Sequence, residues 1–196
     1  MTSQKPNLEA LNLLLSRRSV KSRDMAMPAP NAKDLETILS AAIRVPDHGK
    51  LTPWRYVVLE SAGQEQLGES ITKALIKENE TSEKVAEKMA GFATQAPLLI
   101  VAIFNPERDH AIPLDEQKFS MGAACMNMLL ATHALGYAGL WLTGWASRSP
   151  SVAEDLGLSK NEQIAGFMFI GTPQKVPNER PRPNVADITS FGMPTS

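Results

Sequence analysis

Hydrophobic positions recur at helical spacing in two segments near the start of the chain. Four leucines between residues 8 and 15 fall on one face of a helix that Asn7 can cap. A second segment, which begins with Asn31 as its cap, has the same periodicity until Pro46 stops it. The pattern therefore predicts two short amphipathic helices, the first of which ends near an arginine pair.

Short apolar runs predict strands at residues 56–59, 98–104, 140–142 and 164–170. The run at 98–104 is continuously apolar, which is typical of a central strand covered on both faces. After the first strand, Ser61 and Gln64 have the spacing of a capping box that opens a helix. The stretch that follows is largely polar with a stripe of apolar positions, and it predicts a helical excursion at about 62–94.

The longest helical segment runs from about residue 115 to 135 and is apolar nearly all round. It would span about 30 Å at 1.5 Å per residue. Three small residues, Gly122, Ala123 and Ala124, would let another helix approach closely. A second subunit is the natural cover for this helix, and burial in the core of a single chain is the alternative.

The end of the chain has a different character. Ser149 and Pro150 can open a short helix that ends at Gly157. Residues 172–183 hold four of the fourteen prolines, too many for regular structure, and lead into a tail that an adjacent subunit could exchange. Strands and helices interleave throughout, which predicts a single domain over residues 1–196.

Composition narrows the partners. The 196 residues are 43% hydrophobic, their formal net charge is -1, and no basic run exceeds a dipeptide. The chain therefore lacks the field that attracts nucleic acid or an anionic membrane, and we expect a small-molecule partner. The longest clean apolar run is far below the ~20 residues of a spanning helix.

Cys125 is the only cysteine, so no intrachain disulfide can form. It lies in an apolar run with no cationic neighbour, which indicates a buried, inert thiol rather than a nucleophile. These features predict a cytoplasmic protein.

The sequence Arg17-Arg18-Ser19 is the first candidate for chemistry. Two adjacent guanidinium groups and a hydroxyl offer many hydrogen-bond donors in a small volume, which suits a phosphate ester or another anion. Arginines at the end of a helix also complement its partial negative charge, so the motif alone leaves both interpretations open.

Three blocks together resemble the nitroreductase family of flavin enzymes, in particular its short FMN-dependent members. The blocks are residues 17–21, residues 46–54 just after Arg44, and residues 136–144, which lead later into Gly171-Thr172-Pro173. The resemblance extends from Leu8 to Phe191 and covers nearly the whole chain. It implies an α+β fold with a mixed, mostly antiparallel sheet surrounded by helices.

The resemblance also implies which residues bind FMN. Arg17, Arg18 and Ser19 would hold its phosphate and ribityl chain, Arg44 and His48 would contact its ring and ribityl chain, and Trp141, Leu142 and Thr143 would line the flavin. Each has an ordinary alternative: Arg44 as a helix-end cation, His48 as a loop residue, Trp141 as a core anchor and Thr143 as a strand end.

No catalytic side chain is assigned, because a flavin accepts hydride at N5 without a protein nucleophile. No metal site is predicted either, since the acidic residues after Asp109 and His110 are those expected at the start of a helix. Lys50 and Thr52 stand where many relatives carry asparagine and glutamine, and Lys21 where many carry arginine, so substrate preference does not carry over.

The implied activity is hydride transfer from NADH or NADPH through FMN to a nitroaromatic, quinone or similar acceptor, in a homodimer with a flavin in each of two crevices between subunits. Two alternatives are an FMN carrier or sensor, and a flavin-cleaving or dehalogenating enzyme of the same fold. A hydrolase built from Asp47, His48 and a serine is a third. The roles of Arg180 and Arg182, the physiological acceptor and the choice of nicotinamide donor stay open.

Overall fold

Within residues 5–193, which the computed structural model describes, five strands form one sheet whose centre is the continuous apolar run. β3 (Leu98–Phe104) is buried along its whole length. β2 (Trp54–Leu59) pairs with one of its edges and β5 (Gln163–Pro173) with the other. The prediction of a central strand covered on both faces is therefore confirmed.

β5 carries the remaining strands on its other edge. β4 (Ala138–Leu142) and β1 (Met25–Ala26) both pair with β5, and every pairing among the described residues is antiparallel. The predicted α+β fold with a mostly antiparallel sheet is confirmed. β1 is only two residues long and has no hydrophobic signal in the sequence.

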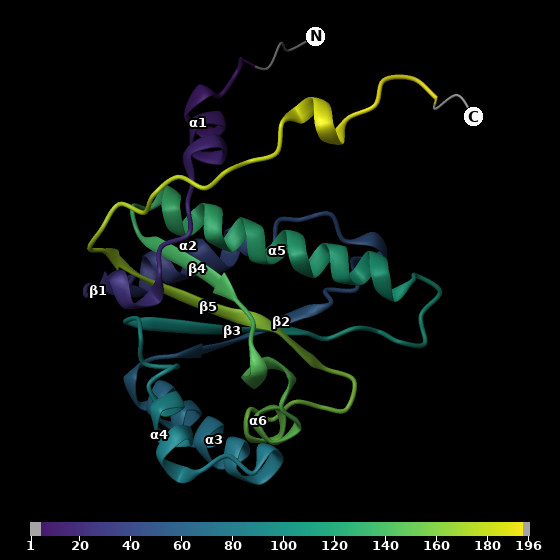
Figure 1. Ribbon diagram of the computed structural model, residues 1–196. Coiled ribbons are helices and arrows are strands. Elements are labelled where there is room, and N and C mark those ends of the chain that lie inside the picture. The colour runs from purple at the N-terminus through teal and green to yellow at the C-terminus, as the bar shows by residue number, and fades with distance from the viewer. Residues whose placement is uncertain (1–4, 194–196) are drawn as a thin grey trace.

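Helices cover both faces of the sheet (Figure 1). α2 (Ala32–Ala42) and α5 (Leu114–Ala134) lie on one face, while α3 (Ser61–Asn79), α4 (Glu83–Ala90) and α6 (Pro150–Asp155) lie on the other. Side chains of β3 alternate between two cores: Ile100 and its even-numbered neighbours pack with α2 and α5, and Val101 and its odd-numbered neighbours pack on the α3 side.

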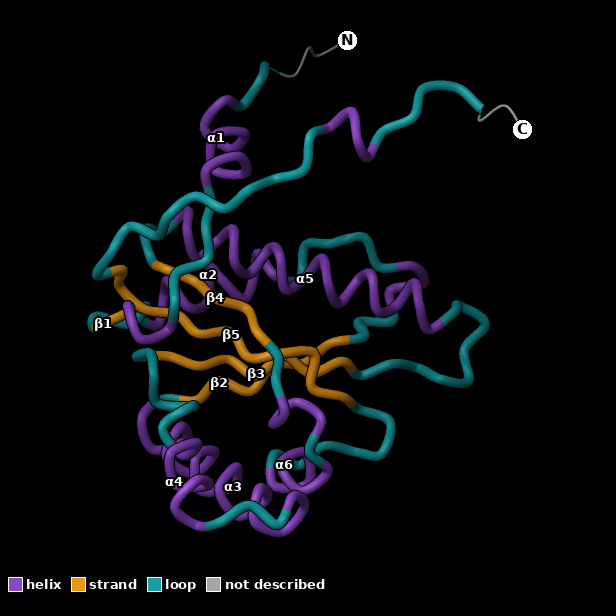
Figure 2. The backbone as a smooth tube through the Cα atoms, viewed as in Figure 1, coloured by secondary structure: helices purple, strands orange, loops and turns teal. Residues whose placement is uncertain are grey.

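α1 (Leu8–Ser16) stands apart from these layers. It buries none of its residues, and the four leucines of its apolar face are not covered by the described chain. Figure 2 shows the loop after β5 passing the end of α1 and continuing with a single helical turn at Val185–Ile188. Exchange of this tail between subunits stays a prediction.

Local capping explains where several helices begin. The side-chain oxygens of Asn7, Asn31 and Ser149 each accept the backbone N–H of the third residue onward, at 3.0, 2.9 and 3.2 Å respectively. The first two helices and the short one after Ser149 therefore begin where the sequence predicts.

The predicted capping box at Ser61 and Gln64 is wrong. α3 begins without a side-chain cap, and Gln64 is buried, with its amide nitrogen donating to the carbonyl of Ala96 at 2.9 Å. A buried carbonyl beside the central strand needs a partner, and this tertiary bond takes the side chain from the local cap.

α3 and α4 occupy the predicted excursion at about 62–94. Their apolar faces join the core through Leu67, Ile71 and Ala86. The predicted domain spans 1–196, and its two ends, 1–4 and 194–196, lie outside the described residues. None of the helices that the structure describes is long and apolar enough to cross a membrane.

Candidate functional site

The arginine pair begins where α1 ends. Arg17 is the cap residue, and its backbone N–H still reaches the carbonyl of Leu13 at 3.0 Å. The chain then turns into extended conformation, and the N–H of Val20 approaches the carbonyl of Gly139 on β4 at 3.4 Å. Arg17, Arg18 and Ser19 are thus half-buried between α1 and the edge of the sheet.

A hollow of about 260 Å³ opens beside this segment. Three parts of the chain line it: the end of α1 with the arginine pair, the end of α5 with the start of β4, and the loop after β5. Its lining residues include Arg17, Arg18, His133, Tyr137, Lys175 and Pro177. Segments from both ends of the chain therefore meet at one cationic depression.

Arg17 has the feature that most strongly indicates a ligand. Its Nε and Nη1 atoms are buried and have no hydrogen-bond partner among the described residues. Leaving a buried charged donor without a partner is costly, and such groups in folded proteins are normally paired. The guanidinium fits an anionic group placed in the hollow, as the phosphate of FMN would be.

His133 lies in the same hollow and also has a buried nitrogen, Nε2, without a partner in the described structure. Burial, with a further contribution from the positive charge of Arg17, lowers the pKa of His133 to about 4. The imidazole is therefore neutral at neutral pH, and it adds a polar atom to the hollow without adding charge.

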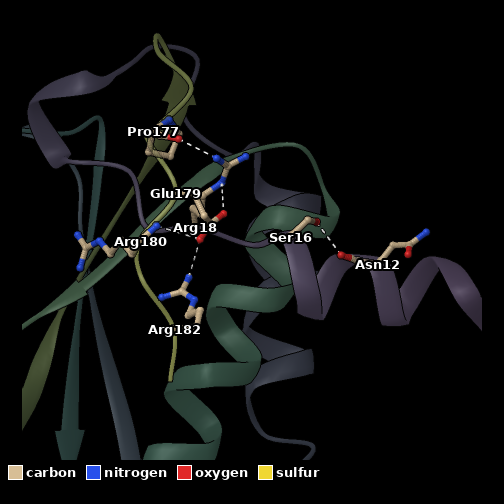
Figure 3. Close-up of polar contacts among 7 residues, drawn as sticks. All are labelled: Asn12, Ser16, Arg18, Pro177, Glu179, Arg180 and Arg182. Atoms are coloured by element: carbon tan, nitrogen blue, oxygen red, sulfur yellow. Dashed lines mark hydrogen bonds and ion pairs between the residues drawn. The ribbon is translucent and has the colours of Figure 1, made fainter. Parts of the chain in front are cut away.

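Arg18 is paired with the tail (Figure 3). Its Nη1 donates to the carbonyl of Pro177 at 2.9 Å, and its Nε lies 3.6 Å from Oε2 of Glu179. The side chain is 31% exposed, so the guanidinium is accessible from the hollow's rim. The two half-buried arginines thus differ: Arg17 has two buried nitrogen atoms without a partner, whereas Arg18 is held by a carbonyl and a carboxylate.

Arg44 and His48 lie elsewhere. The loop after α2 is tied to α5 by the side chain of Asn127, which donates to the carbonyls of Ala41 and Arg44 at 3.2 and 2.9 Å. His48 is exposed, and its Nδ1 lies 2.8 Å from Oε2 of Glu116 near the start of α5. His48 therefore lies near the beginning of α5, whereas Arg44 lies beside Asn127 in the second half of the helix.

This placement separates the predicted site within one chain. Glu116 and His133 are seventeen residues apart on α5, which corresponds to about 25 Å at 1.5 Å per residue. Arg17 and Arg18 lie beside His133, near the C-terminal end of α5. His48 lies beside Glu116, near the N-terminal end of the same helix. Within one chain, the arginine pair and His48 are therefore not brought together in one place.

The neighbouring Asp47 has a structural role in its loop. Its Oδ2 accepts the backbone N–H of Thr52 at 2.8 Å, and Gly49, Lys50 and Thr52 all have positive φ angles. The carboxylate therefore stabilises a tight loop. Its partner is a backbone amide and not His48, which does not suit the Asp-His pair of a hydrolase.

Trp141 and Leu142 are the last two residues of β4 and Thr143 follows them, and the three side chains point to different surroundings. The indole nitrogen of Trp141 donates to the carbonyl of Ala165 at 3.2 Å, and its ring packs with the α5 core. Leu142 packs with the opposite core, and Thr143 is exposed beside Arg148. None of the three side chains lines the hollow at Arg17.

His133 and Tyr137 were not among the residues predicted for the site. A signal for His133 is present in the sequence, because Met121, Cys125 and Leu129 precede it at four-residue steps and form the buried stripe of α5. Tyr137 is half-buried and lines the hollow, and its hydroxyl donates to Oδ2 of Asp34 at 2.8 Å.

Among the residues described, no group of three or more histidine, cysteine, aspartate or glutamate side chains is placed to hold a metal ion. In the loop where the sequence places Asp109 and His110, Nδ1 of His110 accepts the backbone N–H of Ile112 at 3.1 Å.

Comparison with known proteins gives consistent matches. The family model described as "Nitroreductase family" matches residues 14–172. A protein of Escherichia coli strain K12 named "Putative NAD(P)H nitroreductase YdjA" is 36% identical over 167 residues, which cover 85% of this chain and 90% of that protein.

Two solved structures share the fold. A nitroreductase-like family protein from Bacillus cereus has a TM-score of 0.82 at 24% identity, with 97% of this chain and 98% of that chain covered. An NADPH:FMN oxidoreductase from Vibrio harveyi, complexed with NAD+, has a TM-score of 0.73 at 19% identity, with 95% and 78% covered.

Proposed function

This chain belongs to the nitroreductase family, and from that membership we propose that it is an FMN-dependent oxidoreductase that takes hydride from NADH or NADPH. The electrons pass to a nitroaromatic, a quinone or a similar small-molecule acceptor. The name of the Escherichia coli relative supports the nicotinamide donor, and that of the Vibrio harveyi enzyme supports both cofactors. The observation that carries the proposal is the buried, unpartnered guanidinium of Arg17.

Two residues of the hollow and the adjacent Ser19 would have different roles in holding the flavin. Arg17 and Arg18 hold the phosphate, and Ser19 supplies a hydroxyl for the ribityl chain. When bound, the flavin ring supplies the redox chemistry through hydride transfer at N5. The protein's part is to orient the ring and to place donors or cations beside it, which stabilise the reduced, anionic flavin.

We propose that the complete site forms in a homodimer. In a two-fold dimer with antiparallel α5 helices, the end that carries His133 meets the end that carries Glu116 in the other copy. Arg17 and Arg18 would then face the partner subunit's His48, while Arg44, beside Asn127, would lie nearer the middle of the helix pair. The uncovered leucines of α1, and Phe119 on α5 at 75% exposed, support such an interface.

A cytoplasmic location is part of the same proposal. Cys125 is a free, buried thiol, and burial raises its pKa to about 12. The thiolate that forms disulfides is therefore scarce, and the fold of the described residues uses no such bond.

The decisive experiment is reduction of the bound flavin under anaerobic conditions. Purified protein loaded with FMN is mixed with NADH and, separately, with NADPH, and the absorbance of the oxidised flavin band is followed. We expect at least one donor to bleach the band much faster than it bleaches free FMN at the same concentration. Adding a nitroaromatic or a quinone should then restore the absorbance.

Bound flavin that neither donor reduces would contradict the proposed enzyme. That result would favour an FMN carrier or sensor of the same fold. Failure of the purified chain to bind FMN would remove the cofactor itself, and the assignment of the hollow with it.

A further inference from the structure

A carboxylate lies between two guanidinium groups at the edge of the hollow. Oε2 of Glu179 is 3.6 Å from Nε of Arg18, and Oε1 is 3.3 Å from Nη2 of Arg182 (Figure 3). Oε1 also accepts the backbone N–H of Arg180 at 3.0 Å. Glu179 thus has the partners that an incoming anion would need at Arg18.

The tail is fixed at this point by more than the ion pair. Nη1 of Arg18 donates to the carbonyl of Pro177, a residue that also lines the hollow beside Arg17 and His133. Prolines at 177, 181 and 183 restrict the backbone on both sides of Glu179. The carboxylate is therefore delivered to Arg18 by a segment about 160 residues away in the sequence.

The ion pairs of Glu179 are not needed to compensate for the burial of charged groups. The side chain of Glu179 is 60% exposed and that of Arg182 is 57% exposed, so neither group needs a partner to escape an apolar environment. Arg17, whose Nε and Nη1 atoms are buried, has no such partner among the described residues. The internal carboxylate pairs with Arg18 and leaves Arg17 to the ligand.

We propose that Glu179 is an internal competitor for the phosphate-binding site, so that FMN must displace it from Arg18 in order to bind. This inference rests on the proposed function. A phosphate monoester carries close to two negative charges and three acceptor oxygens, whereas the carboxylate carries one charge and two oxygens. The phosphate therefore wins the competition, while monoanions gain little by replacing one carboxylate with another.

The competitor has a defined effect on affinity. A ligand that binds only the fraction of molecules with a free site has an apparent Kd raised by the inverse of that fraction. Exposed ion pairs contribute about 0.2–1 kcal/mol, so removing Glu179 should lower the Kd for FMN about two- to fivefold. Riboflavin has no phosphate, does not need Arg18, and should bind with an unchanged Kd.

The test compares Glu179→Gln with the wild type and with Asp187→Asn in the flavin-free full chain. Asp187 lies in the same exposed tail, but its Oδ2 accepts from the side-chain amide of Asn184 at 3.1 Å. The control thus removes the same charge without touching Arg18. Each protein is titrated at constant ionic strength with FMN and with riboflavin, and binding is followed by flavin fluorescence.

We expect Glu179→Gln alone to bind FMN about two- to fivefold tighter, with the riboflavin Kd unchanged in all three proteins. Equal FMN affinity in wild type and Glu179→Gln, equal tightening in the Asp187→Asn control, or equal tightening toward riboflavin would each overturn the competitor role. If the wild type binds FMN and Glu179→Gln has the same Kd for FMN, only the competitor role of Glu179 is overturned. A wild type that binds neither flavin overturns the proposed function as well.

Discussion

At the scale of a single residue, Arg17 is the main support for an anion in the hollow. A buried guanidinium with two unpartnered nitrogen atoms lowers the stability of the empty protein, and the same atoms become a source of affinity when an anion arrives. The arrangement therefore exchanges folding stability for binding, which is typical of functional sites.

Substitution of Arg17 tests this exchange. We expect Arg17→Gln to weaken FMN binding about tenfold or more, because hydrogen bonds to a charged group contribute about 1.5–3 kcal/mol. The free energy of unfolding of the flavin-free protein should stay the same or rise, since a buried unpaired charge is removed. Flavin fluorescence titration gives the first quantity and urea denaturation the second.

Arg23→Gln is the matched control, because Arg23 is exposed in the turn that follows the site and loses the same charge. It should bind FMN with the wild-type affinity. If both substitutions weakened FMN binding equally, the effect would be one of net charge, and Arg17 would lose its assigned role.

Single residues also show what the sequence could not reveal. Counting donors puts Arg17 and Arg18 forward as candidates, because the number of donors is a local property of the sequence. Burial is not local: His133 becomes a lining residue only because α1 and the loop after β5 close over the end of α5. Trp141 and Leu142 were predicted as one lining group, but strand alternation sends their side chains to opposite cores.

At the scale of elements, the join between β4 and β5 depends on a residue without a side chain. The indole ring of Trp141 lies over Gly166, where a Cβ atom would overlap the ring nitrogen and approach the carbonyl of Leu142 to 3.0 Å. β5 also shifts register against β3 near this residue. The absence of a side chain at Gly166 therefore makes room for the indole ring of Trp141 where β4 pairs with β5.

We expect Gly166→Ala to lower the free energy of unfolding by about 1–3 kcal/mol, the usual cost of overpacking. Gly91→Ala is the control, since nothing lies within 4 Å of a Cβ there, and it should change stability little. Urea denaturation measures both, and near-UV circular dichroism reports the displaced tryptophan. Wild-type stability in Gly166→Ala would show that the ring moves aside freely.

An ion pair fixes β2 to the loop before β5. Nη2 of Arg55 donates to Oε2 of Glu162 at 3.1 Å, and the carboxylate also accepts the N–H of Ser159 at 2.8 Å. The hydrogen bond from Arg55 is the main cause of a lowered pKa for Glu162, and the bond from Ser159 adds to it. The ionised carboxylate is thus favoured in the folded state.

The sign of the pH dependence follows. Stability from this pair is present above the unfolded pKa of glutamate, about 4.3, and is lost as the pH falls through the lowered folded pKa. Glu162→Gln should therefore lower the free energy of unfolding by about 1–2 kcal/mol at neutral pH and by less near pH 3, as measured by urea denaturation at both. Glu69→Gln, which removes an exposed pair with Lys73, should change it by less than about 0.5 kcal/mol at either pH.

Secondary-structure prediction succeeded for a strand that is buried on both faces, and for capping side chains that have no competing hydrogen-bond partner. β3 and the caps at Asn7 and Asn31 are such cases. It failed at Gln64, where a buried carbonyl of Ala96 competes for the same amide. β1 could not be predicted, because two residues carry no periodicity and their pairing is set by β5.

At the scale of the whole molecule, the fold distributes the predicted site over the two ends of α5. The resemblance names eight residues as one site, but sequence does not say whether they come from one chain or two. The distance along α5 between His133 and Glu116 is the observation that supports the proposed antiparallel dimer. This step required the structure, because the positions of the arginine pair and His48 depend on tertiary packing.

We expect Phe119→Glu to raise the dissociation constant of the dimer at least about tenfold, a change of 1.4 kcal/mol, because it places a charge in a core of the proposed interface. Bound FMN should be lost in parallel as monomer accumulates. Val85→Glu is the control: Val85 is also an exposed apolar residue, but on α4, on the opposite face of the sheet. Sedimentation velocity with detection at the flavin absorbance measures both quantities.

A wild-type monomer that retains FMN at micromolar concentration would contradict the shared site. So would a Phe119→Glu protein that stays dimeric and yellow.

The lack of any buried residue in α1 bears on how long the protein survives in dilute solution. A nine-residue helix is too short to persist unaided in water, where about 12–15 residues are needed. If the proposed dimer dissociates, the segment that contains Arg17 and Arg18 should become the site that trypsin cleaves fastest. In dilute solution, trypsin would then cleave at the arginines proposed to bind the phosphate before the rest of the domain unfolds. An excess of FMN should slow that cleavage.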